Sequence, residues 1–230
     1  MPKISKYIIF ISLLFLSATA NLNAQTAENK KDTVKTNKTW FYGIRAEVDM
    51  SSFLKSAISK DTYSFEGAVQ ANVLQSYFPV IEIGFAGANH LANNNIGFKT
   101  DGLFGRVGLD FKLLKQKPSE KPVPHLLLAG ARLGMSPFAY NISNVEIIDN
   151  YWNETQMLDF KGNKTFQVWA EVVASTRVEI FKNIFMGWSV RLKLKFSETK
   201  KGPISPWYIP GYGVNNDSHW DFNYSIGYAF

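Results

Sequence analysis

Residues 166–196 read FQVWAEVVASTRVEIFKNIFMGWSVRLKLKF, and in this stretch apolar side chains recur at every second position. The first run extends from Phe166 to Ile180, and Lys182–Asn183 connects it to a second run with the same alternation. A period of two is typical of β-strands, because successive side chains of a strand point to opposite faces. The stretch therefore predicts a β-hairpin with one apolar face and one charged face.

The same alternation occurs in eight segments of the chain. Their apolar faces span Trp40–Val48, Tyr63–Val73, Ile81–Phe85, Leu103–Leu113, Leu127–Met135, Phe166–Ile180, Ile184–Phe196 and Trp220–Phe230. Most segments have about 9 to 13 residues, the length that a tilted strand needs to cross a bilayer as part of a barrel. We therefore predict an all-β fold, an eight-stranded antiparallel up-and-down transmembrane β-barrel formed by residues 40–230.

The two faces of these segments differ in charge. The apolar face has no charged side chain, whereas the other face carries eight acidic and eight basic residues. An isolated charge in a narrow lumen is costly, so these groups are expected to pair and to close the lumen. The predicted lumen charge network contains Arg45, Glu47, Glu66, Glu82, Arg106, Asp110, Arg132, Glu171, Arg177, Glu179, Arg191 and Lys193.

Alternation alone does not decide which face points outward, and a soluble lipocalin-type barrel or a secreted sandwich would share it. The apolar face carries fourteen aromatic residues, more than the interior of an eight-stranded barrel can hold. Seven of ten strand glycines lie on the charged face, as a crowded lumen requires. These features favour an apolar face turned towards lipid.

The lengths of the connections also alternate. Long connections are expected at Ser51–Thr62, Ala88–Gly102, Ser136–Thr165 and Ser197–His219, and the intervening ones are shorter. Outer-membrane barrels have short periplasmic turns and long external loops. We therefore expect an outer-membrane protein in contact with membrane lipids, with external loops at the cell surface and both termini in the periplasm.

The N-terminal segment has the pattern of an export signal. Lys3 and Lys6 precede an apolar run from Tyr7 to Leu16, which predicts a signal peptide at residues 1–24. Residues 25–39 are polar and predict a disordered periplasmic leader. These two segments contribute four of the six net positive charges, and the remaining excess is too small for nucleic-acid binding.

The chain offers little that resembles a catalytic or metal site. No two of His90, His125 and His219 have the spacing of metal ligands, and cysteine is absent, so no metal or cofactor is expected. Asp217, Ser218 and His219 are neighbours in sequence, but catalytic triads draw their members from separate elements. We therefore do not expect an enzyme.

The expected external loops contain large aromatic residues. Pro203, Pro206 and Pro210 stiffen the last loop, and tyrosine and tryptophan are frequent in binding hot spots. In the alternative interpretation, these side chains pack over the barrel mouth or form the interfacial aromatic belt. The candidate partner-binding residues are Phe138, Tyr140, Tyr151, Trp152, Trp207, Tyr208 and Tyr212.

Several motifs resemble a known family. Trp169–Glu171, Val178–Ser189, Tyr42–Asp49 and, most specifically, the Ile-Pro-Gly motif within Tyr208–Tyr212 are similar to a Bacteroidota envelope family, the domain of unknown function DUF6048. The resemblance implies a small outer-membrane barrel from that phylum, and it implies no activity.

A closed lumen beneath aromatic loops predicts an accessory or scaffold subunit of a larger outer-membrane assembly, such as protein assembly or secretion machinery. Its expected partner is a lipoprotein or a larger outer-membrane barrel complex. The alternatives are a surface-facing outer-membrane enzyme that uses His90 or His219, and a small pore.

Overall fold

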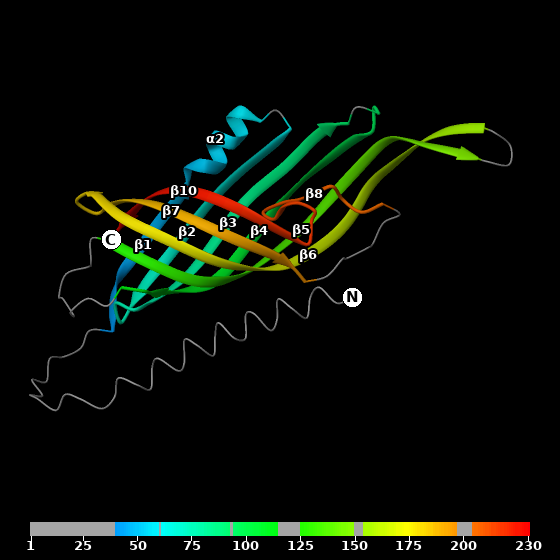
Figure 1. Ribbon diagram of the computed structural model, residues 1–230. Helices are drawn as coiled ribbons and strands as arrows, with labels where there is room; N and C mark the ends of the chain where they lie inside the picture. Colours follow the sequence, from blue (N-terminus) through cyan, green and yellow to red (C-terminus); the bar gives the residue numbers. More distant parts are fainter. Residues whose placement is uncertain (1–39, 60, 93, 115–124, 150–153, 197–203) are drawn as a thin grey trace, which may run out of the picture. The chain divides into compact units, whose positions relative to one another are not determined.

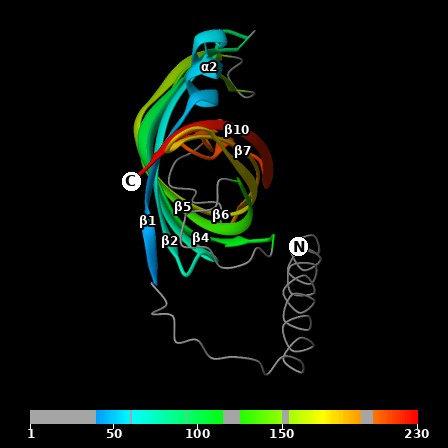
Figure 2. The same cartoon turned by 90° about the vertical axis from the view of Figure 1, so that its left-hand side faces the viewer.

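The computed structural model describes residues 40–59, 61–92, 94–114, 125–149, 154–196 and 204–230, so the predicted signal peptide and leader lie outside the described residues. Eight antiparallel strands form a closed barrel in the order β1-β10-β7-β6-β5-β4-β3-β2 (Figures 1 and 2). Their bounds are β1 Phe41–Asp49, β2 Thr62–Val73, β3 Tyr77–Leu91, β4 Gly97–Lys112, β5 His125–Asp149, β6 Glu154–Phe181, β7 Ile184–Lys195 and β10 Ser218–Ala229. The predicted eight-stranded antiparallel up-and-down barrel is confirmed.

The barrel wall has the predicted orientation, with apolar side chains outside and charged side chains inside. On β3, Ile81 and Ile83 are 59% and 64% exposed, whereas Glu82 between them is 2% exposed. The same inversion of ordinary burial recurs around the wall, where large apolar residues are exposed and arginines and glutamates are buried. This is the distribution that a barrel in lipid requires, because its surroundings are apolar and its lumen is not.

Two of the expected external loops are mostly strand. β3 and β4 continue through much of Ala88–Gly102, and β5 and β6 continue through most of Ser136–Thr165, so these loop predictions are wrong. The reason is a change of face. On β5, Phe138, Tyr140 and Ile142 are buried inside the barrel, so apolar residues now occupy the inward positions that charged residues hold further down the wall.

The β5–β6 hairpin extends beyond the rest of the wall. Pairing between β4 and β5 ends at Gly97 and Ser143, and pairs such as Val145 with Leu158 join β5 only to β6 among the described residues. We call residues 144–149 and 154–159 the distal hairpin. Figure 1 shows it as the ribbon that projects furthest past its neighbours.

The long connection predicted after β1 is present, because β1 ends at Asp49 and β2 begins at Thr62, but it is largely helical. Helix α2 spans Met50–Ile58, and its N-cap Asp49 accepts hydrogen bonds from the backbone N–H groups of Ser51 at 2.8 Å and Ser52 at 3.3 Å. An aspartate that accepts from the second and third residues beyond it is a strong start signal for a helix. The described part of the chain contains no helix long and apolar enough to cross a membrane.

Helix α2 lies where the wall lacks a strand. β1 ends at Asp49, whereas β10 continues past Ser225 and β2 continues past Gly67, and no described strand joins them there. Side chains of α2 bind the open backbone edges: the Ser56 hydroxyl accepts from the Ser64 N–H at 2.8 Å, and the Lys55 ammonium donates to the Phe222 carbonyl at 3.2 Å. We call this gap between β2 and β10 the lateral opening.

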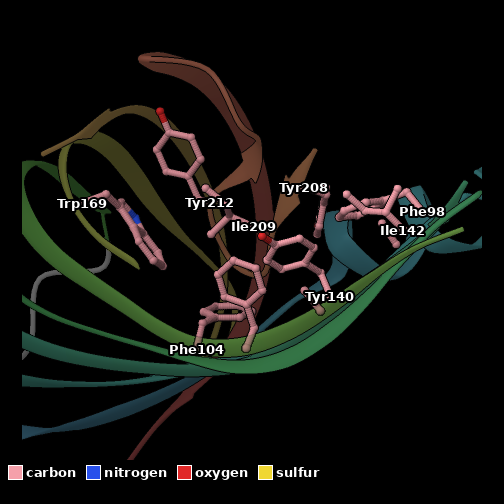
Figure 3. Packing of buried hydrophobic residues seen from close by; sticks show 11 residues of the cluster. Phe98, Phe104, Tyr140, Ile142, Trp169, Tyr208, Ile209 and Tyr212 are labelled. Carbon is pink, nitrogen blue, oxygen red and sulfur yellow. The ribbon is translucent and has the colours of Figure 1, made fainter. Parts of the chain in front are cut away.

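The interior is filled in three layers. Phe78, Leu126 and Leu128 form a small apolar cluster towards the end where β1 begins and β10 ends. Charged side chains fill the middle. A larger apolar cluster, which we call the aromatic plug, fills the opposite end, the loop end; its buried members are Ala86, Ala88, Phe98, Phe104, Phe138, Tyr140, Ile142, Trp169, Tyr208, Ile209 and Tyr212 (Figure 3).

Candidate functional site

The middle of the lumen is organised around one carboxylate. Glu82 on β3 accepts from three arginines on three strands: Arg106 Nη1 at 3.0 Å, Arg132 Nε at 3.0 Å and Arg191 Nη1 at 2.6 Å. Glu82 and Arg106 are register partners in neighbouring strands, whereas Arg191 reaches across from β7. All four side chains are buried, so the strands on opposite sides of the lumen are tied together by charge-assisted hydrogen bonds.

Other acids surround the same arginines. Glu66 lies 2.7 Å from Arg106 and 3.2 Å from Arg191, and Glu171 lies 2.8 Å from Arg106. Trp169 donates its indole N–H to Glu171 at 2.6 Å, which connects the charged layer to the aromatic plug.

The β4–β5 side of the network is a bidentate pair. Arg132 Nη1 and Nη2 donate to the two oxygens of Asp110 at 2.6 and 3.0 Å, and Gln70 donates to the same carboxylate at 2.8 Å. A planar guanidinium on a carboxylate is the geometry in which an ion pair is most directional.

A second group of charges lies nearer the start of β1 and the end of β10. Arg177 Nε donates to Glu47 at 2.7 Å, Ser225 donates to the other Glu47 oxygen at 3.1 Å, and Arg45 lies over the ring of Phe185, 4.2 Å from its centroid. The charge of the predicted network residue Glu179 acts on Arg45 in this group. Its carboxylate accepts the backbone N–H of Asn183 in the β6–β7 turn at 3.0 Å.

A third cluster lies beside α2. Asp221 on β10 accepts from Lys193 at 3.0 Å and from Lys55 at 2.6 Å. Lys193 belongs to the predicted network, whereas Lys55 lies in a segment that we expected to be a loop. Sequence periodicity gives no signal for its role, because a helix replaces the alternation there.

The last loop folds into the barrel and closes it. The short strands β8 (Tyr208–Ile209) and β9 (Gly213–Val214) pair with each other, and Ile209 and Tyr212 are 1% and 0% exposed. The Gly211 carbonyl between them accepts from Arg106 Nη2 at 2.8 Å and from Lys193 Nζ at 3.0 Å. The loop is thus held by the charged layer beneath it.

Gly211 is required by this arrangement. Its φ of +77° is left-handed, and a Cβ added to it would lie 2.4 Å from the Phe104 ring. The Ile-Pro-Gly motif therefore brings the backbone into direct contact with an aromatic ring of the wall. Burial raises the pKa of both Tyr208 and Tyr212 to about 12, so both hydroxyls stay neutral, and the Tyr212 hydroxyl donates to the Asn216 carbonyl at 2.7 Å.

The candidate partner-binding residues have different placements. Phe138, Tyr140, Tyr208 and Tyr212 are buried in the aromatic plug, which corresponds to the alternative of packing over the barrel mouth. Trp207 is 39% exposed and stacks on His90 with a centroid distance of 4.8 Å. The two remaining candidates, Tyr151 and Trp152, lie outside the described residues.

An aromatic residue on the charged face is a sequence signal for the plug that the alternation of apolar residues does not include. Trp169 occupies an inward position of β6, directly opposite Gly134 on β5. A Cβ on Gly134 would lie 2.3 Å from the indole ring. A large aromatic residue on the charged face, with glycine as its neighbour, indicates a side chain that fills the lumen.

Asp217, Ser218 and His219 do not form a catalytic triad. Ser218 and His219 are consecutive on β10, so their side chains point to opposite faces. His90 lies 2.9 Å from Asp61 and against Trp207. In the part of the chain that the structure describes, no group of three or more histidine, aspartate or glutamate side chains is arranged to hold a metal ion.

One cavity within the charged layer is small. A cavity of about 20 Å³ lies among Glu47, Glu66, Arg177, Arg191 and Asn223. This volume accommodates about one water molecule, so the charged layer has no channel of ionic width at this position.

Comparison with known proteins gives the family and two similar folds. The family model described as "Domain of unknown function (DUF6048)" matches residues 4–230. No curated protein sequence matches the chain. A major outer membrane protein from Thermus thermophilus is similar in structure, with 12% identity, a TM-score of 0.48 and coverage of 82% of this chain and 100% of that one. Neisserial surface protein A has 10% identity, a TM-score of 0.39 and coverage of 83% and 97%. Since the family match spans nearly the whole sequence, the chain belongs to the DUF6048 family.

Proposed function

We propose that this protein is a small, non-enzymatic outer-membrane β-barrel that serves as an accessory or scaffold subunit of a larger outer-membrane assembly, of the kind that assembles or secretes proteins. The partner is another envelope protein, either a lipoprotein or a larger barrel. The external loops face the cell surface and the termini face the periplasm.

The outward apolar wall supports the membrane location, and the filled lumen argues against a transport role. Arginine–carboxylate pairs occupy the middle of the barrel and the aromatic plug occupies its loop end. A conducting barrel needs a continuous aqueous path or a ring of charges of one sign. We therefore place the partner-binding surface on the outside of the molecule.

The distal hairpin is the observation that carries this proposal. It is a two-stranded ribbon whose outer edges have no strand partner among the described residues. Ile147 is 44% and Met157 is 66% exposed. An isolated two-stranded ribbon is at best marginally stable in water, and a free edge is a template for strand addition. A partner strand that adds to this edge would satisfy the backbone groups and cover the apolar side chains.

The first test is site-specific photocrosslinking in intact cells. A photoreactive residue at Gln156, on the exposed edge of the distal hairpin, is expected to crosslink to a second outer-membrane protein. The matched control is the same residue at Phe65, which is 59% exposed on the wall of β2 and is expected to give no crosslink to that protein.

The second test removes the ribbon. Replacement of residues 143–159 by Asn-Gly, a favoured two-residue hairpin turn, is expected to leave a folded barrel that no longer copurifies with the partner. Isolation of only the free monomer from native membranes, crosslinks only to another copy of this chain, or retention of the partner by the shortened barrel would each refute the proposal.

A further inference from the structure

A cavity of about 620 Å³ lies at the lateral opening, between α2, β2, β10 and the last loop. It is lined by the outward-facing residues Tyr63 and Trp220 and by the inward-facing residues Glu66 and Lys193. Successive strand residues point to opposite faces, so a cavity lined from both faces passes through the barrel wall. Its volume lies in the range of small-molecule sites, roughly 300–1,000 Å³.

The outer part of this cavity is apolar. Trp220 and Phe222 on β10 are 67% and 56% exposed, and Leu54 and Ile58 on α2 are 54% and 84% exposed. On a wall whose outer face is apolar, these residues form the mouth of the cavity. An alkyl chain that lies against the wall can therefore reach the mouth without leaving apolar surroundings.

The inner part of the cavity has an excess of positive charge. Lys55 and Lys193 share the single carboxylate of Asp221, whereas Arg106 is neutralised by Glu66 at 2.7 Å. The Lys55 side chain is 54% exposed and donates to two acceptors, Asp221 and the Phe222 carbonyl, among the described residues. An ammonium group has three donors, so Lys55 retains the capacity to bind an anion in the cavity.

A neutral hydroxyl lies in the same space. Tyr208 lines the cavity, and burial together with the neighbouring Asp221 carboxylate raises its pKa to about 12. The hydroxyl therefore keeps its proton near neutral pH. Tyr208 and Lys55 line the same cavity.

We propose that the lateral opening binds a membrane-derived amphiphile whose anionic head group lies at Lys55 and whose alkyl chain lies against Trp220 and Phe222. The head group passes through the gap that β1 leaves open, and the chain stays outside the barrel wall. This site does not depend on the protein partner proposed above. A free fatty acid and an anionic phospholipid share the required chemistry.

The test is native mass spectrometry of the full chain released from dodecyl maltoside micelles. Laurate supplies the fatty acid, phosphatidylglycerol supplies the phospholipid, and lauryl alcohol is the uncharged comparison. We expect one bound laurate or phosphatidylglycerol per barrel and at least tenfold weaker retention of lauryl alcohol. Preference for laurate identifies a free fatty acid as the ligand, and preference for phosphatidylglycerol identifies an anionic phospholipid.

Variants then locate the head group. Lys55→Gln is expected to weaken retention about tenfold, the effect of losing one charge-assisted hydrogen bond. Lys161→Gln is the matched control, because Lys161 also pairs with an aspartate, at 3.2 Å, but near the distal hairpin; it is expected to change nothing. Asp221→Asn removes the competing carboxylate and is expected to strengthen retention, a result that misfolding does not produce.

Three results would overturn this inference. The first is no retained laurate or phosphatidylglycerol on the wild-type barrel. The second is equal retention of lauryl alcohol, which would show that charge is not recognised. The third is equal retention by Lys55→Gln and Lys161→Gln, with no increase for Asp221→Asn.

Discussion

Substitution of Gly211 by alanine tests whether the last loop is held in the lumen by close backbone packing. Gly211 has a φ of +77°, and an added Cβ would lie 2.4 Å from Cγ and 2.8 Å from Cβ of Phe104. The backbone fixes the Cβ of Phe104, so this contact is relieved only if β4 or the last loop shifts. Gly162 on β6 supplies the matched control, because its φ is also positive, at +69°, but an added Cβ would meet nothing within 4 Å.

The expected magnitudes separate the two effects. A left-handed conformation costs an L-residue about 1–2 kcal/mol, and this cost applies to both variants. Overpacking typically adds about 1–3 kcal/mol, and it applies only at Gly211. We therefore expect Gly211→Ala to lower the free energy of unfolding by about 2–5 kcal/mol and Gly162→Ala to lower it by about 1–2 kcal/mol.

The measurement is reversible urea unfolding in lipid vesicles, followed by tryptophan fluorescence, since Trp169 packs against Tyr212 with a centroid distance of 5.8 Å. Limited proteolysis of the folded barrel reports separately on the loop, which is expected to become cleavable between residues 204 and 217 in Gly211→Ala alone. Equal destabilisation by the two variants, with the loop still protected, would refute the view that this loop is a packed plug.

Three further predictions concern the lumen and the lateral opening. Glu82→Gln removes the carboxylate shared by three arginines and is expected to lower the free energy of unfolding in urea by about 3–5 kcal/mol. Glu146→Gln on the exposed distal hairpin is the control and is expected to change that free energy by less than about 0.5 kcal/mol. A small effect at Glu82 would contradict a cooperative charge network. Ser56→Ala removes the acceptor of the Ser64 N–H, so hydrogen exchange at that amide is expected to accelerate by about tenfold. This factor corresponds to a hydrogen bond worth roughly 1.4 kcal/mol. Unchanged exchange would show that α2 does not cap the β2 edge. In planar bilayers the wild-type barrel is expected to give no unitary conductance, and steady ion channels of the wild type would favour the pore alternative over a filled lumen.

Much of the barrel follows from local pattern. In the hairpin of residues 166–196, the alternation of apolar and charged residues predicted both strands and the tight turn between them, because a strand with one face in lipid and one in a charged lumen must alternate. The same reasoning predicted that the inward charges pair with one another, and Glu82 pairs with three arginines. Membership of the charged layer required no knowledge of which acid meets which base.

Other features were invisible to that pattern. Phe138 and Tyr140 are apolar but inward, so they break the alternation on which the strand prediction depends. Their position depends on Ile209 and Tyr212, which arrive from a segment about 70 residues later. Only the folded chain brings these groups together, because apolar burial inside the barrel requires a partner from another part of the sequence.

Strand periodicity could be read from the amino-acid order alone, because it depends on residues two positions apart. The charge balance and the direction of the two faces followed from the composition of each face and from the lengths of the connections. Three-dimensional packing decided three other features. β1 stops at Asp49, and α2 lies along the exposed edges of β2 and β10. The Gly211 carbonyl binds Arg106 and so holds the last loop in the lumen. These outcomes depend on distances between residues far apart in the chain. Close packing and hydrogen-bond geometry determine them, and neither is encoded in local alternation.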